Sequence, residues 1–311
     1  MKVLFISSGR NGNVSVIVRN QGESLKAEGI EIDYFLVKPG LSGYISSIPK
    51  IRRTFRKGKY DLAHAHYSLS GFVAALAGCK PLIVSLMGSD VLMSIWFRIL
   101  IRFFYRYLWD GTIVKTDQMK LILRIHKANV NPNGVDLSKF IPMTKSIARQ
   151  YVRYYDKRYF ILFISGLNRP EKNIELAKAS INLINDKNDL EFRHIYNIPN
   201  YEVAYYLNAA DVLLLTSKWE GSANVLKEAM ACNCPAVSTN VGDVNLLFDE
   251  EPGYYVSEYS VEDIADKLKQ VLSYSKNTGK TKGRDRILKL GLDSETISKR
   301  IIEIYKKHLS N

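Results

Sequence analysis

The sequence has no long apolar run. None of its uninterrupted apolar stretches reaches the roughly 18 residues of a membrane-spanning helix. Near the start, only Val3 to Ile6 are apolar before Ser7, which indicates a buried strand and not a secretory signal peptide. Cysteine is scarce too. Cys79, Cys232 and Cys234 are odd in number and lack a nearby histidine, so they fit neither a disulfide framework nor a zinc site. We expect these cysteines to be small buried residues of a protein in the reducing cytoplasm.

Short-period repeats, low-complexity tracts and nucleic-acid-binding signatures are also absent. His64 and His66 are two residues apart on one face of an expected strand, but the sequence shows no third ligand. We therefore interpret them as buried, hydrogen-bonded histidines and expect no metal site.

The positive charge is concentrated in one half of the chain. Residues 1–150 contain 22 Lys and Arg against 9 Asp and Glu, an excess of 13, whereas residues 151–311 contain 22 of each. Such asymmetry indicates an anionic partner for the first half. We expect an anionic membrane surface and no nucleic acid, with a nucleic-acid-binding protein as the alternative.

Apolar strand-like runs alternate with helix-like runs in the first half, as in a parallel sheet covered on both faces. The expected strands are Val3–Ser7, Ile32–Val37, Leu62–His66, Leu82–Leu86 and Thr112–Val114. The expected helices are Val14–Ala27, Ile48–Arg56, Phe72–Ala77 and Ile95–Trp109.

The same alternation restarts after the basic, aromatic stretch Ala148–Tyr159. The expected strands are Tyr159–Ser165, Leu190–Tyr196, Val212–Thr216 and Pro235–Ser238, and the expected helices Ile174–Ile184, Ala223–Ala231, Val261–Leu272 and Ser294–Lys307. This pattern predicts an α/β chain of two Rossmann-like domains facing a central cleft. We place the first domain at 1–150 and the second at 151–293, with a terminal helix in 294–311 that can return to the first.

The segment from Ser217 to Glu228 follows an expected strand and opens a helix. Free backbone N–H groups at a helix start suit a diphosphate. Glu220 precedes the helix and Glu228 lies within it, roughly 9 Å further along the axis, so the two carboxylates can hold opposite ends of one ligand. The alternative is two solvated helix carboxylates. The backbone contacts that we expect are those of Gly221, Ser222, Ala223, Asn224 and Val225.

The stretch Asn208–Pro235 closely resembles the donor-binding signature of family 4 glycosyltransferases, which have the GT-B fold and typically retain anomeric configuration. Other segments resemble that family in the expected order: Asp61–His66, Asn133–Asp136 with Phe140, and Pro170–Asn173. Val84–Asp90 and Val237–Val244 resemble teichuronic-acid-type enzymes in particular.

This resemblance implies roles for individual residues. Glu228 would hold the donor ribose, Glu220 the donor sugar and Lys172 the diphosphate. The family usually has Arg just after the strand's last glycine, but Leu167 follows Gly166 here, and Arg169 is our candidate replacement. Gly12, in the loop Ser7–Asn13, would face the diphosphate.

Two departures from the family are visible. Met87-Gly88 stands where many relatives have His-Gly, so this chain lacks that imidazole. Tyr196 leads almost directly into Tyr201, where relatives often have a further strand, which alters the region expected to bind the base. The sequence contains no Asp-x-Asp motif, which argues against the class of metal-dependent, single-domain glycosyltransferases.

The expected helix Ile95–Trp109 is basic and amphipathic. Arg98, Arg102 and Arg106 form one stripe, and an opposite stripe consists of Trp96, Leu100, Phe103 and Tyr107. A basic helix with aromatic residues is typical of an interfacial membrane binder. Alternatively, the aromatic stripe packs on the sheet and the arginines are solvated. Both interpretations are compatible if the arginines face lipid headgroups while the aromatic residues stay in the core.

These features predict a metal-independent glycosyltransferase with no cofactor besides its substrate, a nucleoside-diphosphate sugar, expected to be UDP-linked. The expected acceptor is a glycan or polyprenyl-linked oligosaccharide in cell-surface polysaccharide synthesis, at the inner face of the plasma membrane. A nucleotide-sugar epimerase or a sugar phosphorylase of the same fold is the remaining alternative.

Overall fold

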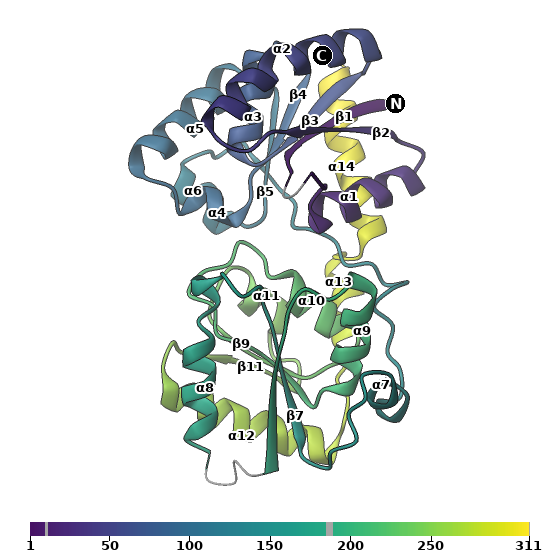
Figure 1. Ribbon diagram of the computed structural model, residues 1–311, viewed down its shortest axis with the longest axis vertical. Helices are drawn as coiled ribbons and strands as arrows, with labels where there is room; N and C mark the ends of the chain where they lie inside the picture. The colour runs from purple at the N-terminus through teal and green to yellow at the C-terminus, as the bar shows by residue number, and fades with distance from the viewer. Residues whose placement is uncertain (10–11, 185–188, 311) are drawn as a thin grey trace. The chain divides into compact units, whose positions relative to one another are not determined.

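The computed structural model describes residues 1–9, 12–184 and 189–310. The chain forms two compact units, the first comprising Met1–Gly134 with Ser294–Asn311 and the second Val135–Asp293. Each unit has alternating strands and helices around a parallel sheet (Figure 1). The predicted α/β class with two Rossmann-like domains is therefore confirmed, and the predicted cleft stays a prediction.

The first unit contains a parallel sheet with strand order β2-β1-β3-β4-β5-β6. Its strands are β1 (Lys2–Ser8), β2 (Glu31–Val37), β3 (Leu62–His66), β4 (Leu82–Ser85), β5 (Gly111–Val114) and β6 (Asn129–Val130). Its helices are α1 (Val16–Ala27), α2 (Leu41–Gly58), α3 (Ser68–Leu76), α4 (Gly88–Val91), α5 (Ile95–Tyr107), α6 (Asp117–Leu123) and α14 (Ser294–Leu309).

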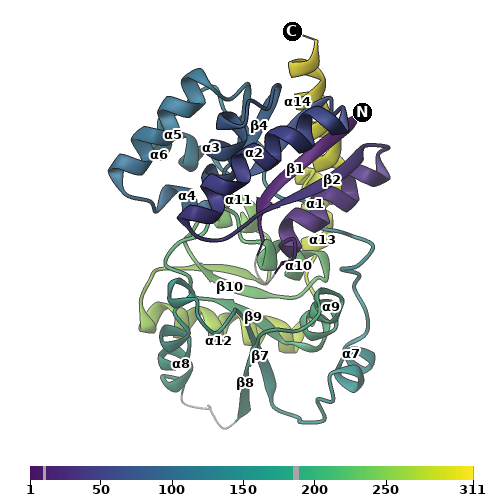
Figure 2. The ribbon, with the colours of Figure 1, turned by 45° about the horizontal axis from the view of Figure 1, so that its top comes forward.

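Helix α14 returns to the first unit at the end of the chain. It packs against α1, as Figure 2 shows. The Tyr305 hydroxyl also lies 2.5 Å from Nδ1 of His64, in the buried strand β3. Burial of Ile297, Ile301 and Tyr305 along one face of α14 holds the helix in place.

The second unit has strand order β11-β10-β9-β7-β8, again all parallel. Its strands are β7 (Tyr159–Ile164), β8 (Leu190–Ile195), β9 (Val212–Leu215), β10 (Ala236–Thr239) and β11 (Tyr254–Ser257). Its helices are α7 (Lys145–Tyr151), the 3-10 turn η1 (Pro170–Lys172), α8 (Ile174–Asn182), α9 (Asn200–Ala209), α10 (Asn224–Ala231), α11 (Val244–Phe248), α12 (Val261–Asn277) and α13 (Gly283–Leu290).

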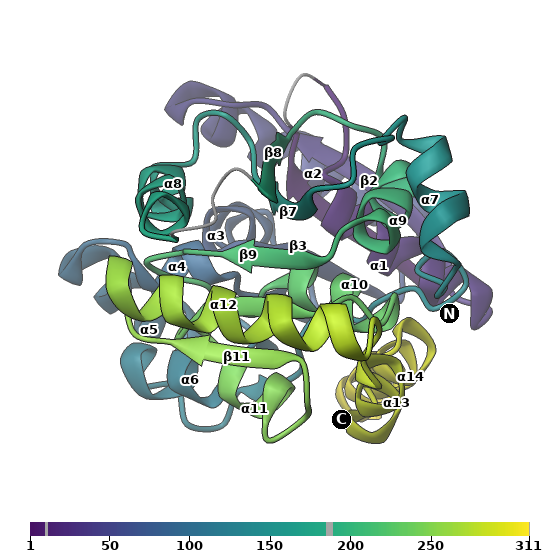
Figure 3. The same ribbon diagram turned by 90° about the horizontal axis from the view of Figure 1, so that it is seen from below.

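One core of the second unit lies between its sheet and the pair α8 and α12. Ile161, Phe163 and Val212 of the sheet pack there against Ala177 and Leu268 of these helices. Figure 3 shows α12 running along the sheet beside β9 and β11. The apolar strand sequences thus reflect coverage of the sheet by helices, as predicted.

The structure divides the chain after Gly134, whereas the sequence pattern placed the division after residue 150. Helix α7 belongs to the second unit because its cations pair with Asp211, which is buried. Lys145 Nζ lies 2.6 Å from Asp211 Oδ1, and Arg149 Nη2 lies 2.7 Å from Oδ2. The Tyr151 ring stacks on that of Tyr205 at 3.7 Å. These contacts join segments far apart in sequence, which an alternation pattern does not reveal.

Candidate functional site

The loops after β7 and β9 meet at the point where the second sheet reverses its strand order. Ligands of such sheets bind at this edge. The Thr216 hydroxyl donates to the carbonyl oxygens of Lys172 and Asn173, at 3.0 and 2.9 Å. Lys218 N donates to Glu171 O at 2.8 Å. The two predicted ligand loops are therefore joined into one surface within the second unit.

Lys172 and Glu220 form an ion pair across this surface. Lys172 Nζ contacts Glu220 Oε1, which also accepts a hydrogen bond from the Ser217 hydroxyl at 2.7 Å. The side chains of Lys172 and Glu220 are only 12% and 14% exposed. Glu220 therefore does not fit the alternative of a solvated helix carboxylate.

Glu228 lies in the second turn of α10, which begins at Asn224. Burial of its carboxyl raises the pKa of Glu228 to about 7, although the neighbouring charge of Lys227 favours the ionised form. No side chain caps the start of α10, whose N-cap is Ala223. The helix N-terminus thus presents backbone donors and a positive dipole end beside the loop of Glu220.

A buried charge network that the sequence did not suggest stabilises this loop. Lys227 is fully buried and donates to the Ser222 hydroxyl at 3.0 Å, and that hydroxyl donates to Asp243 Oδ2 at 2.6 Å. Burial lowers the pKa of Lys227 and raises that of Asp243. Asp243 Oδ1 is buried without a partner among the described residues. The one available signal is a lysine within the apolar run of α10.

Gly242 allows a close approach between two loops of the site. Its φ is +59°, and a Cβ there would lie 2.9 Å from Gly221 O and 3.1 Å from Glu220 O. A side chain at this position would therefore displace the backbone that carries Glu220. The Thr239 hydroxyl adds a bond of 2.8 Å to Ser217 O, so β10 also fixes the site.

Two predicted phosphate contacts stand apart from this group. Arg169 is half-exposed and pairs with Glu171 in the loop that carries Lys172. Gly12 belongs to the first unit, where it has a φ of +75° and open space around it. Arg10 and Asn11 of the same predicted loop lie outside the described residues. The diphosphate contacts of Arg169 and Gly12 stay predictions.

The first unit has its own point of strand-order reversal, between β1 and β3. His64 is buried as predicted, and its ring nitrogens contact the hydroxyls of Tyr305 and Ser85. His66 is also buried, but neither of its ring nitrogens has a hydrogen-bond partner among the described residues, contrary to expectation. Burial lowers the pKa of both histidines, that of His64 to about 3, with a smaller contribution from Lys115. Both rings are therefore neutral at physiological pH.

Tyr67 follows directly at the carboxyl end of β3 with φ +72° and ψ 151°. Only glycine normally adopts this backbone region. The strained residue lies at the reversal of the first sheet, where a ligand is expected.

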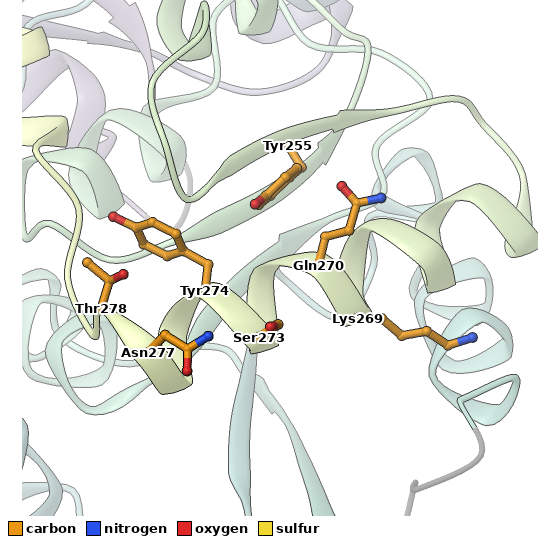
Figure 4. Close-up of a pocket in the computed structure, with 7 residues that line it drawn as sticks. All are labelled: Tyr255, Lys269, Gln270, Ser273, Tyr274, Asn277 and Thr278. Carbon is orange, nitrogen blue, oxygen red and sulfur yellow. The ribbon is translucent and has the colours of Figure 1, made fainter.

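Two surface hollows lie in the second unit. One of about 280 Å³ is lined by Lys218, Thr239, Asn240, Val241, Glu258 and Tyr259, at the carboxyl ends of the strands and next to the site. The other is shallow and is lined by Tyr255, Lys269, Gln270, Ser273, Tyr274, Asn277 and Thr278, as Figure 4 shows. This hollow lies at the amino ends of the strands, whereas Glu220 lies at their carboxyl ends. We assign it no role.

The sequence left the orientation of α5 open, and the structure argues against the alternative in which the aromatic stripe packs in the core. Trp96, Phe103 and Tyr107 of that stripe are exposed. A third stripe, formed by Phe97, Ile101 and Phe104, packs inward instead, and Phe104 lies 4.5 Å from the α3 residue Phe72 between ring centroids. The cations Arg98 and Arg102 are half-buried on a flank, where Arg102 Nε donates to Leu123 O, and Arg106 is exposed.

Other predicted features can be placed directly. All three cysteines are buried and unpaired, as expected. The described residues contain no group of three or more His, Cys, Asp or Glu side chains placed to hold a metal. Among the helices of the described ranges, none combines the length and apolarity needed to cross a membrane. Strand β8 ends at Ile195 and α9 begins at Asn200, so residues 196–199 contain no further strand.

Comparisons with solved structures agree with this architecture. Sucrose-phosphate synthase from Thermosynechococcus elongatus superposes with a TM-score of 0.80 at 18% identity, over 99% of both chains. HepE of Anabaena, solved with UDP-glucose, gives a TM-score of 0.78 at 14% identity, over 99% of this chain and 100% of that one. The fold is thus that of the GT-B glycosyltransferases.

Sequence comparisons agree over most of the chain. Residues 8–139 match Glycosyltransferase Family 4, and residues 193–274 match Glycosyl transferases group 1. A Bacillus subtilis protein named as a teichuronic acid biosynthesis glycosyltransferase, TuaC, is 28% identical over 67% of this chain, and the match spans 60% of that protein's length. An Escherichia coli UDP-Gal:alpha-D-GlcNAc-diphosphoundecaprenol alpha-1,3-galactosyltransferase is 25% identical over 73% of this chain and 70% of its own length. The chain is thus a glycosyltransferase whose residues 8–139 match the family 4 model.

Proposed function

We propose that this chain transfers a sugar from a UDP-linked donor to a membrane-associated glycan or polyprenyl-linked acceptor in cell-surface polysaccharide synthesis. The reaction retains anomeric configuration, needs no metal or cofactor, and takes place at the inner face of the plasma membrane. The observation that carries the proposal is the Lys172–Glu220 pair beside the uncapped start of α10. The names of the E. coli relative and of the HepE complex support UDP and a polyprenyl-linked acceptor.

The chemistry follows from where charge develops. Breaking the bond between the anomeric carbon and phosphate places negative charge on the leaving diphosphate, while the sugar becomes oxocarbenium-like. Lys172 and the backbone N–H groups at the start of α10 stabilise the diphosphate, together with Arg169. Glu220 orients the sugar and favours its positive charge. Glu228 accepts hydrogen bonds from the ribose diol.

A thermal-shift screen tests the donor. UDP and UDP-sugars are expected to raise the melting temperature more than ADP or GDP, because a ligand that binds only the native state stabilises it. The matched control is Lys178→Ala, which removes an exposed cation of α8. Equal shifts for the native chain and Lys172→Ala would refute the assigned donor site.

A second assay tests the reaction. Free UDP is expected only when a polyprenyl-linked acceptor is added, and the product's anomeric proton coupling is expected to match that of the donor. An epimerase would change the donor sugar without releasing UDP, and a phosphorylase would require inorganic phosphate. Either result would replace the proposed transfer.

A further inference from the structure

The outer face of α5 is apolar and has no covering element among the described residues. Trp96, Phe103 and Tyr107 are 78%, 52% and 67% exposed. Ile95, Ile99 and Leu100 are also exposed and lie on this face of the helix. Scattered exposed apolar residues are ordinary, but a contiguous aromatic and aliphatic stripe marks an interaction surface.

Folding does not require this stripe. Helix α5 is already fixed on its inner side by Phe97, Ile101 and Phe104, and it is capped by Ser94, whose hydroxyl accepts from Phe97 N at 3.4 Å. The exposed apolar side chains of α5 therefore add nothing to the core of the unit. A binding partner outside the unit would explain their presence.

The surroundings of the stripe are basic. Residues 92–127 contain six Lys and Arg that are not buried, against two Asp and Glu. The helices α4, α5 and α6 lie together in the first unit (Figure 2). Arg106 lies on the outer face of α5, and Arg124 and Lys127 are exposed after α6. Both acidic residues are already paired, Asp117 with Lys120 and Asp110 with Lys80.

We propose that the outer face of α5 docks on an anionic lipid bilayer. The helix lies in the plane of the interface, with Trp96, Phe103 and Tyr107 at the boundary of headgroups and acyl chains, while the surrounding cations contact lipid phosphates. This inference deepens the proposed function by naming the surface at which the acceptor is met. The lipid contact itself needs neither donor nor acceptor.

Other occupants fit the face less well. A duplex nucleic acid binds mainly through cations to phosphates, whereas only Arg106 among the exposed residues of this face is charged. A second copy of the chain, paired isologously about this face, would bury the apolar stripe but would place the basic surroundings of the two copies next to each other. A bilayer satisfies both the apolar stripe and its basic surroundings.

Vesicle binding by the full chain tests the inference. The probe is vesicles of phosphatidylglycerol and phosphatidylcholine in equal parts, compared with phosphatidylcholine alone, by co-sedimentation. The double variant Trp96→Ser/Phe103→Ser is expected to lose about 10-fold or more in partitioning. Arg106→Gln is expected to lose about 5-fold on the anionic vesicles only. The matched control is Tyr155→Ser, which removes an aromatic ring that is 77% exposed in the second unit.

The outcomes separate the possibilities. Failure of the native chain to bind anionic vesicles, or equal binding by the double variant, overturns the proposal. So does tighter binding to duplex DNA or RNA than to vesicles, or a dimer in light scattering that the double variant abolishes. A normal melting temperature and a normal shift with UDP in the double variant show that the fold and donor site are intact. Loss of the UDP shift in the native chain would instead count against the proposed function.

Discussion

Lys172 and Glu220 form an ion pair across the reversal of the second sheet, although 48 residues separate them in the chain. Each side chain belongs to a loop that follows a different strand, and Thr216 joins the two loops. The pair therefore keeps a cation and a carboxylate in place at the strand ends, where a donor diphosphate and its sugar are expected.

Lys172→Ala is expected to weaken UDP binding about 10- to 100-fold. A charge-assisted hydrogen bond contributes about 1.5–3 kcal/mol, which corresponds to that range of affinity. The loss also leaves the mostly buried Glu220 carboxylate without its cation, next to the diphosphate. Isothermal titration calorimetry with UDP measures the effect. Unchanged affinity in Lys172→Ala would contradict the role given to this lysine.

Stability is expected to fall as the pH rises through the range set by Glu228. The pKa of this carboxyl is raised from 4.5 to about 7 in the folded chain, so the folded state binds the proton more tightly than the unfolded state. Its contribution is fully present below pH 4.5 and is lost as the pH rises to about 7. We expect Glu228→Gln to remove about 1–3 kcal/mol of this dependence in urea unfolding.

A matched control for that measurement is Glu303→Gln, which alters an exposed carboxylate of α14. It is expected to leave the profile between pH 4.5 and 7 unchanged. If the free energy of unfolding depends on pH in the same way in the native chain and in Glu228→Gln, the carboxyl is ionised in the folded protein throughout this range.

The buried network of Lys227, Ser222 and Asp243 gives a third prediction. Lys227→Ala is expected to lower the free energy of unfolding by about 3–5 kcal/mol, because Asp243 then lies inside the protein without a cation. In Lys227→Met/Asp243→Asn neither member of this pair carries a charge, and much of the loss is expected to be recovered. A double-mutant cycle by urea unfolding measures the coupling. Additive losses would mean that the two charges act independently.

The backbone conformation of Tyr67 gives a fourth prediction. Alanine and glycine both remove the ring, but only glycine adopts a φ of +72° with ψ 151° without strain. Tyr67→Gly is therefore expected to be more stable than Tyr67→Ala by about 1 kcal/mol or more. At ordinary positions the order is the reverse. Thermal unfolding of the two variants is the measurement, and a more stable alanine variant would count against strain at this residue.

The apolar strands and the position of the loop that carries Glu220 were predictable because their signals are local. Val3 to Ile6 and Val212 to Leu215 are apolar throughout, as strands with two covered faces must be. Glu220 and Glu228 follow such a strand at the opening of a helix, and the order of strands and loops alone places them at the carboxyl end of the sheet. The return of α14 was left open by the sequence and is shown by Tyr305 beside His64.

The remaining features depend on contacts between distant segments. Helix α5 carries two apolar stripes, and only the position of Phe72 on α3 decides that Phe104 faces inward and Phe103 outward. Helix α7 joins the second unit because Asp211, about 60 residues later, attracts its cations. Local periodicity determines which segments form helices and strands, whereas packing and charge pairing between them decide which face is buried and which unit a helix joins.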